Sequence, residues 1–157
     1  MDYLQAKGAA ALGGRLRRLS ETIDADSGRI YGEQGVVFEQ RWFGVLNQLV
    51  ERGGASVGEI AATLRITHAS VSQARQSLEA AGLVGSAPDP ADGRRRQLVL
   101  TAEGQALVER LRPVWSACEA AAEDLNREAE DVIAALDRLE AALARQSLGD
   151  RIRARLG

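Results

Sequence analysis

The chain has 157 residues, a formal net charge of −2 and 45% hydrophobic residues, enough for one buried core with helical segments left over. The one cysteine excludes an intramolecular disulfide, and no apolar run approaches the roughly 20 residues that cross a bilayer, so we expect a cytoplasmic protein without a membrane partner. One histidine, one cysteine and no glycine-rich phosphate loop or clustered carboxylates indicate no metal, no cofactor and no enzyme.

Residues 1–35 are expected to form a helix followed by a loop around Gly28. The helix has one apolar stripe at helical spacing, formed by Leu12, Leu16, Leu19 and Ile23. A helix at the chain end with a spare apolar face needs a partner. We therefore interpret it as a dimerisation helix.

An aromatic cluster surrounds the start of the next helix, which is expected near Glu39. It holds four of the chain's six aromatic residues, namely Tyr31, Phe38, Trp42 and Phe43. One interpretation is plain core packing. The other is a ligand pocket in which Arg41 neutralises a carboxylate, although Arg41 can equally form a salt bridge.

A helix-turn-helix is predicted between Ser56 and Gly82. Ser56 and Glu59 form a capping-box pattern, and the short helix that follows has Val57, Ile60, Ala61 and Leu64 on one face. Arg65 and Ile66 form a tight corner, where a positive φ is less comfortable for arginine than for glycine. Thr67 then caps a second helix over about 67–81, which ends at Gly82 and has a buried side of Val71, Ala74, Leu78 and Gly82.

The outer face of the second helix has no acidic residue. It consists of small or uncharged polar residues, namely Ala69, Ser70, Ser72, Gln73, Gln76 and Ser77. Such a face suits a helix that enters the major groove, because glutamine pairs bidentately with adenine. The alternative is a serine- and glutamine-rich face without a partner. Arg75 projects toward the Val71 and Leu78 side, so we expect it at the edge of the packing surface, paired with an acid or reaching a flanking phosphate.

A β-hairpin is predicted directly after this helix. Extended segments at 83–87 and 97–100 flank the turn-forming pairs Asp89-Pro90 and Asp92-Gly93, and three arginines, Arg94, Arg95 and Arg96, lie at the tip. Guanidinium groups on a short ribbon can contact phosphates or enter a narrow minor groove. A solvated charged turn is the alternative. The net charge does not oppose DNA binding, because the acidic excess lies in residues 102–157, with eight basic and eleven acidic side chains.

Two further helices are expected after the hairpin. The first is capped at Thr101 and has a stripe of Leu107, Leu111, Trp115 and Cys118; the second has a stripe of Val132, Leu136, Leu139 and Leu143. These stripes also favour dimerisation. On its stripe Cys118 is expected to be a buried, inert thiol, with an oxidation sensor as the alternative.

The wing motif resembles that of MarR-type transcriptional regulators, in which D-x-x-D-G-R precedes a strand and L-T-x-x-G. The matching residues are Asp89, Asp92, Gly93, Arg94, Leu100, Thr101 and Gly104. The resemblance implies an intertwined homodimer on a near-palindromic operator, with recognition helices in adjacent major grooves. It also implies that Arg94 enters the minor groove, that Asp92 orients it, and that effectors bind between the dimer helices and the winged domain. The chain departs from the family where Gln73 and Ser77 replace arginines common in its recognition helices.

We therefore expect a mainly α fold with a small β-hairpin wing, in which a winged helix-turn-helix (36–101) is flanked by N-terminal (1–35) and C-terminal (102–157) dimerisation helices. The expected function is a DNA-binding repressor with a small-molecule effector; the alternative is a winged-helix protein-interaction adaptor. The candidate DNA contacts are Arg65, Thr67, His68, Ser70, Ser72, Gln73, Gln76, Ser77, Arg94, Arg95 and Arg96. The candidate effector pocket consists of Tyr31, Phe38, Arg41, Trp42 and Trp115.

Overall fold

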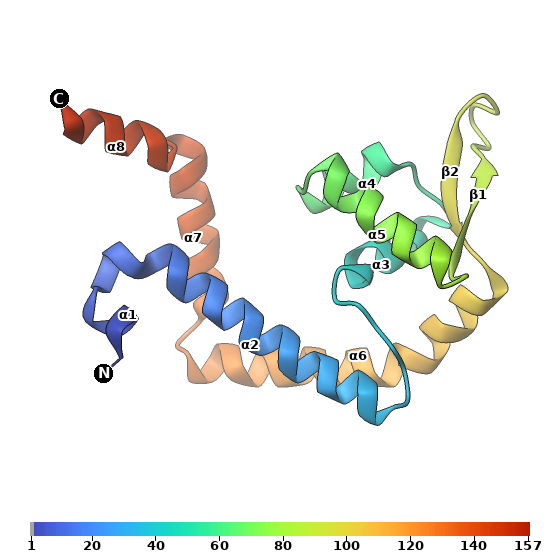
Figure 1. Cartoon of the computed structure of the whole chain (residues 1–157), viewed down its shortest axis with the longest axis horizontal. Coiled ribbons are helices and arrows are strands. Elements are labelled where there is room, and N and C mark those ends of the chain that lie inside the picture. Colours follow the sequence, from blue (N-terminus) through green and yellow to red (C-terminus); the bar gives the residue numbers. More distant parts are fainter. Residues whose placement is uncertain (1) are drawn as a thin grey trace. The chain divides into compact units, whose positions relative to one another are not determined.

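The computed structural model describes residues 2–157, which form two compact units. The first unit ends at Val114, and the second runs from Trp115 to Gly157. Among the described residues, the strands form a single two-stranded hairpin and most of the remaining chain is helical (Figure 1). The predicted mainly α fold with a small hairpin wing is confirmed.

The first unit begins with three helical elements: α1 (Tyr3–Ala6), a 3-10 turn (Gly8–Ala11) and the long helix α2 (Leu12–Glu33). The loop expected around Gly28 is wrong, because Gly28 lies inside α2. A lone glycine costs a helix about 1 kcal/mol but does not end it, and an Asp26–Arg29 ion pair spans this turn. The chain leaves the helix only after Glu33, where Gly35 adopts a φ of +65°.

Helix α3 (Trp42–Arg52) begins three residues later than expected. Residues 36–40 are not helical. The Trp42 N–H donates to the Glu39 carbonyl at 2.8 Å, in a turn that leads into the helix. The helix buries Val45, Leu46 and Leu49 in the core and ends at Gly53.

The helix-turn-helix is confirmed as α4 (Val57–Leu64) and α5 (His68–Ala80). Both bonds of the Ser56 capping box are present, and Thr67 caps α5. The corner between the helices requires a left-handed residue, and Arg65 supplies it with φ +53° despite its side chain. Gly82, at φ +72°, follows the last helical turn but is exposed and does not line the buried side of α5.

The wing consists of antiparallel strands β1 (Val84–Pro88) and β2 (Arg96–Leu100). Its register pairs Val84 with Leu100 at the base and Pro88 with Arg96 at the tip. Ala55, just before α4, exchanges two backbone hydrogen bonds with Leu98 of β2, at 3.1 and 2.8 Å. The wing base is therefore fixed to the helix-turn-helix.

The hydrophobic core of the winged helix joins α3, α4, α5 and both strands. Its buried residues are Trp42, Val45, Leu46, Leu49, Ala55, Ile60, Ala61, Val71, Ala74, Leu78, Leu83, Val84 and Leu98. Helix α6 (Ala102–Glu128) starts in the first unit, where it buries Val108 and Leu111. Thr101 caps it as predicted, since its hydroxyl accepts from the Gly104 N–H at 3.0 Å.

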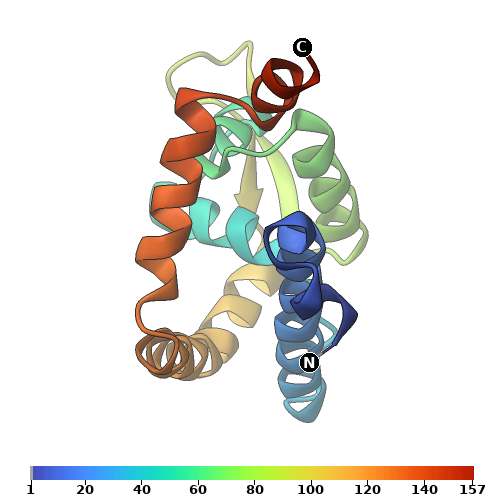
Figure 2. The same ribbon diagram turned by 90° about the vertical axis from the view of Figure 1, so that its left-hand side faces the viewer.

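The second unit holds the end of α6 together with α7 (Val132–Arg145) and α8 (Leu148–Leu156). Figure 2 shows α8 turning sharply away from α7. Arg151 of α8 stabilises the end of α7 by donating to the carbonyl of Ala142 at 3.0 Å. Cys118 is only half-buried in the chain, which departs from the expectation of a buried thiol.

The apolar stripes of both units remain largely uncovered. Leu12, Leu16, Leu19 and Ile23 of α2 are between 38% and 56% exposed, and Val132 and Leu143 of α7 are 41% and 44% exposed. Neither α7 nor α8 has a buried residue. Among residues 2–157, no helix combines the length and the apolar character needed to cross a membrane.

Candidate nucleic-acid interface

Helix α5 separates a buried side from an uncharged outer side. Val71, Ala74 and Leu78 are buried, whereas Gln73 and Gln76 are exposed. At the start of the helix the exposed predicted residues are Thr67, His68 and Ser70, with the Thr67 and Ser70 hydroxyls 2.8 Å apart. Ser72 is half-buried. The outer face thus presents two glutamine amides and small hydroxyls without a competing charge.

Ser77 does not belong to this outer face. The Trp42 indole N–H donates to its hydroxyl oxygen at 2.7 Å, and the Ser77 hydroxyl donates to the Ala74 carbonyl at 3.1 Å. The prediction that Ser77 points outward is wrong, because a buried indole N–H needs an acceptor and Ser77 supplies it. A tryptophan expected in the core was the signal in the sequence that an acceptor had to lie nearby.

Arg75 lies within α5 and Arg65 lies just before it, and their guanidinium groups differ in whether they have a partner. Arg75 pairs with Glu79 across one helical turn at 2.9 Å, which is the first of the two alternatives that the sequence left open for it. Arg65 lies at the exposed corner before α5, and its guanidinium makes no hydrogen bond or ion pair within residues 2–157. Arg65 is therefore available to an external anion.

At the wing tip, Asp92 organises the backbone. Its carboxylate accepts from the Arg94 N–H at 3.1 Å, and its carbonyl accepts from the Arg95 N–H at 2.8 Å. The Arg95 carbonyl in turn accepts from the Asp89 N–H at 3.0 Å. Asp92 therefore acts on Arg94 through the main chain.

The three wing arginines have three different environments. The Arg94 guanidinium makes no bond to any residue of the described chain. Arg95 lies 3.5 Å from the Asp92 carboxylate, with both side chains exposed. Arg96 donates twice to Ser86 of β1, from Nε to Oγ at 3.1 Å and from Nη2 to the carbonyl at 2.8 Å. The sequence offered no signal for the Ser86 contact, because nothing in the spacing indicates which strand residue a long side chain reaches.

Glu59 lies close enough to Arg52 and Arg95 for their positive charges to act on its carboxylate. Hydrogen bonds from the Ser56 side chain and backbone lower the pKa of Glu59, and the positive charges of Arg52 and Arg95 add to the effect. The Glu59 carboxylate is therefore charged at neutral pH and serves as the cap of α4.

The aromatic cluster packs as part of the core. Tyr31 and Phe38 have ring centroids 4.3 Å apart, and Phe38 meets Trp42 edge-on at 5.6 Å. Tyr31 and Trp42 are each 4% exposed, and Arg41 forms an ion pair with Glu39. Of the five candidate pocket residues, Trp115 belongs to the second unit. These contacts agree with the core-packing interpretation of the cluster.

Comparison with known proteins identifies this fold. A family model described as MarR family matches residues 38–95. The chain is similar to BpsR of Bordetella bronchiseptica, studied for the regulation of its DNA binding by 6-hydroxynicotinic acid (27% identity, 76% of this chain, 92% of that chain, TM-score 0.57). It is also similar to a probable transcriptional regulator from Pseudomonas aeruginosa (26% identity, 85% and 95%, TM-score 0.54).

A further solved structure shares the fold at lower identity. The S. aureus MepR–DNA complex is 22% identical, covers 83% of this chain and 97% of the other, and has a TM-score of 0.67. No curated protein matches the chain significantly. The matched segment contains the helix-turn-helix and the wing tip with Asp92, Gly93 and Arg94. The resemblance predicted from the wing motif is thus confirmed: residues 38–95, which run from the end of the loop before α3 to the wing tip, match the MarR family model.

Proposed function

We propose that this chain is a homodimeric transcriptional repressor that binds a near-palindromic operator, with α5 in the major groove and residues 88–96 in the minor groove. One observation carries the proposal: a helix with an uncharged outer face and exposed Gln73 and Gln76 is followed directly by a hairpin, at whose tip the Arg94 guanidinium is unpaired within residues 2–157. Glutamine pairs bidentately with adenine, and guanidinium groups favour narrow minor grooves. BpsR, whose DNA binding is regulated, is the relative that supports this assignment.

The proposed contacts divide between the helix and the wing. Those on and before α5 are Arg65, Thr67, His68, Ser70, Ser72, Gln73 and Gln76. On the wing, Arg94 enters the minor groove and Arg95 exchanges Asp92 for a phosphate. That exchange costs little, because an exposed ion pair contributes only about 0–1 kcal/mol.

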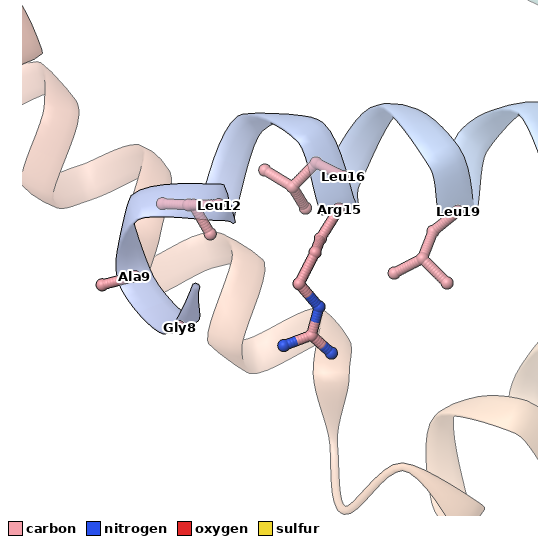
Figure 3. Close-up of a pocket in the computed structure, with 6 residues that line it drawn as sticks. All are labelled: Gly8, Ala9, Leu12, Arg15, Leu16 and Leu19. Carbon is pink, nitrogen blue, oxygen red and sulfur yellow. The ribbon is translucent and has the colours of Figure 1, made fainter. Parts of the chain in front are cut away.

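The proposed dimer is formed by the segments 1–35 and 102–157. An open groove of about 420 Å³ lies at the start of α2 and is lined by Gly8, Ala9, Leu12, Arg15, Leu16 and Leu19. Figure 3 shows the leucine side chains and the extended Arg15 side chain projecting from α2. This groove and the stripe of α7 offer apolar surface for a second copy to cover, which favours an interface with twofold symmetry.

We further propose that a small molecule relieves repression. The support is the likeness to BpsR, whose DNA binding is regulated by 6-hydroxynicotinic acid. Aromatic carboxylates added to the protein–operator complex test this: release of DNA at saturating ligand supports it, and an unchanged affinity across the series contradicts it.

Selection of binding sites from random DNA tests the function itself. We expect half-sites rich in A·T where α5 reads the major groove, because no outward arginine of α5 is available for guanine. Gln73→Ala should relax this preference, whereas Gln146→Ala, a matched change in the link between α7 and α8, should not. A G·C-rich consensus that Gln73→Ala leaves unchanged would contradict the assignment.

The salt dependence of affinity separates the repressor from a protein-interaction adaptor. A repressor that contacts several phosphates loses affinity with a slope of about 0.9 per contact in log K against log salt. A chain that selects no sequence and shows no such slope would be the adaptor.

A further inference from the structure

At the outer end of the wing ladder, the two strands exchange no backbone hydrogen bonds. In the register of the hairpin, Pro88 of β1 lies opposite Arg96 of β2, and both residues are exposed. Leu98 bonds Ala55 through both its N–H and its carbonyl, so Leu98 and Ser86 are not a hydrogen-bonded pair, and by the alternation of an antiparallel ladder neither are Arg96 and Pro88. Proline fits at this position, because no N–H is needed toward the partner strand. The next backbone link toward the tip runs from the Asp89 N–H to the Arg95 carbonyl at 3.0 Å.

The Arg96 side chain adds a link between the strands at this pair. Ser86 pairs with Leu98, so Arg96 reaches diagonally across the ladder to the residue two positions before its own partner, on the same face of the hairpin. Two nitrogens of its guanidinium donate to Ser86, at 3.1 and 2.8 Å. Hydrogen bonds from a charged donor are about twice as strong as neutral ones.

The neighbouring arginines are not used in this way. Arg94 has no partner for its guanidinium among residues 2–157, and Arg95 has only the exposed carboxylate of Asp92. The backbone that carries them starts directly from the strand pair that Arg96 and Ser86 join, because β2 begins at Arg96. The position of Arg94 therefore depends on that pair.

We propose that Arg96 is a positioning residue of the wing: bound to Ser86, it holds the strands together so that Arg94 reaches the minor groove, and it contacts no phosphate itself. This inference rests on the proposed DNA binding. It gives each wing arginine its own role: Arg94 contacts the minor groove, Arg95 contacts a phosphate, and Arg96 links the two strands.

The test measures operator affinity of the full chain at several salt concentrations. Arg96→Met and Ser86→Ala should both weaken binding, by about tenfold and less than tenfold respectively, because the Ser86 carbonyl remains as an acceptor in the second variant. Neither should change the salt slope. Arg95→Ala is the matched control and should flatten the slope by about 1.8, twice the 0.9 expected for one phosphate in each half of a dimer.

A double-mutant cycle measures the coupling between Arg94 and Arg96 in operator affinity, which a general loss of stability would not produce. If Arg96 acts through Arg94, Arg94→Ala should cost much less affinity in the Arg96→Met background than in the wild type. Hydrogen exchange without DNA should accelerate at residues 84–100 in Arg96→Met and remain unchanged in α4 and α5.

Three outcomes would overturn the inference while leaving DNA binding intact. They are an Arg96→Met slope as flat as that of Arg95→Ala, an undiminished effect of Arg94→Ala in the Arg96→Met background, and unchanged exchange in the wing. A wild-type chain that binds no selected sequence is a different result, because it refutes the proposed function together with this inference.

Discussion

Thr101 and Gly104 join α6 to the segment that follows α5. The Thr101 hydroxyl donates to the Gly82 carbonyl at 2.6 Å, and its N–H donates to the Leu83 carbonyl at 3.1 Å. A Cβ atom on Gly104 would lie 2.0 Å from that same Leu83 oxygen. The L-T-x-x-G part of the wing motif therefore has a structural role, because only glycine lets the two backbones approach this closely.

We expect Gly104→Ala to destabilise the fold by about 1–3 kcal/mol or more, since backbone must shift to remove the overlap. Urea unfolding followed by circular dichroism measures this. Gly28→Ala is the control: nothing lies within 4 Å of its added Cβ in α2, so it should stabilise the helix by roughly 0.5–1 kcal/mol. Equal stability of the two variants would contradict the close approach.

Ser77 illustrates a polar side chain that serves the core. It accepts from the Trp42 indole, which is 4% exposed. We expect Ser77→Ala to cost about 1–3 kcal/mol of stability, because it leaves a buried donor unpaired. Ser72→Ala, five residues earlier in α5, should cost less than about 1 kcal/mol, because no buried donor depends on it. Thermal unfolding of both variants decides the point, and a salt slope of DNA binding that changes in Ser77→Ala would speak for an outward role.

At the scale of elements, the wing is a rigid base with an exposed tip. Ala55 bonds Leu98 at the base, and the side-chain amide of Gln97 lies against Gly54, 2.7 Å from where a Cβ atom would be. The tip is held by backbone bonds around Asp92 and buries no side chain. Changes at the tip should therefore alter binding without altering the fold.

We expect Arg94→Ala to weaken binding to all sequences, most strongly where the flanking minor groove is narrow, by about 1–3 kcal/mol in each half-site. Circular dichroism should not change, and Arg138→Ala, an exposed arginine of α7, should bind normally. Titrations on A-tract and mixed-sequence flanks measure the effect. An Arg94→Ala, Arg95→Ala, Arg96→Ala protein with wild-type affinity and slope would mean that the hairpin is only a solvated turn.

At the scale of the whole molecule, each unit leaves apolar helix faces that nothing in the same unit covers. Leu16 of α2 is 38% exposed, and Leu139 of α7 is half-buried on a helix with no buried residue. Burying one leucine contributes about 1.5–3 kcal/mol, so several such residues from two copies favour association strongly. We expect folding and dimerisation to be one event.

We expect Leu139→Asp to dissociate or unfold the protein, because the dimer would have to bury an unpaired carboxylate. Ala141→Asp places the same group on the opposite face of α7 and should leave the assembly intact. Analytical ultracentrifugation at micromolar concentration measures both. A well-folded wild-type monomer under these conditions would defeat the prediction.

The helices and strands of the winged helix could be predicted from the amino-acid sequence. The Ser56 capping box, the Thr67 cap, the turn pairs of the wing and the spacing of Val71, Ala74 and Leu78 act within a few residues, so they are legible without a fold. For the same reason Gln73 and Gln76 could be placed outward, and Arg75 could be placed at the edge of the packing surface with an acid or a phosphate as its partner.

Which polar side chains remain available to a ligand depends on contacts between distant parts of the chain. Ser77 is bonded to a tryptophan 35 residues earlier, and Arg96 to a serine ten residues earlier. The continuation of α2 through Gly28 and the delayed start of α3 at Trp42 also depart from the local signals. Ser77 and Arg96 share one physical reason. A hydrogen bond forms between groups that are close in the folded chain, and the periodicity of the sequence carries no information about that distance.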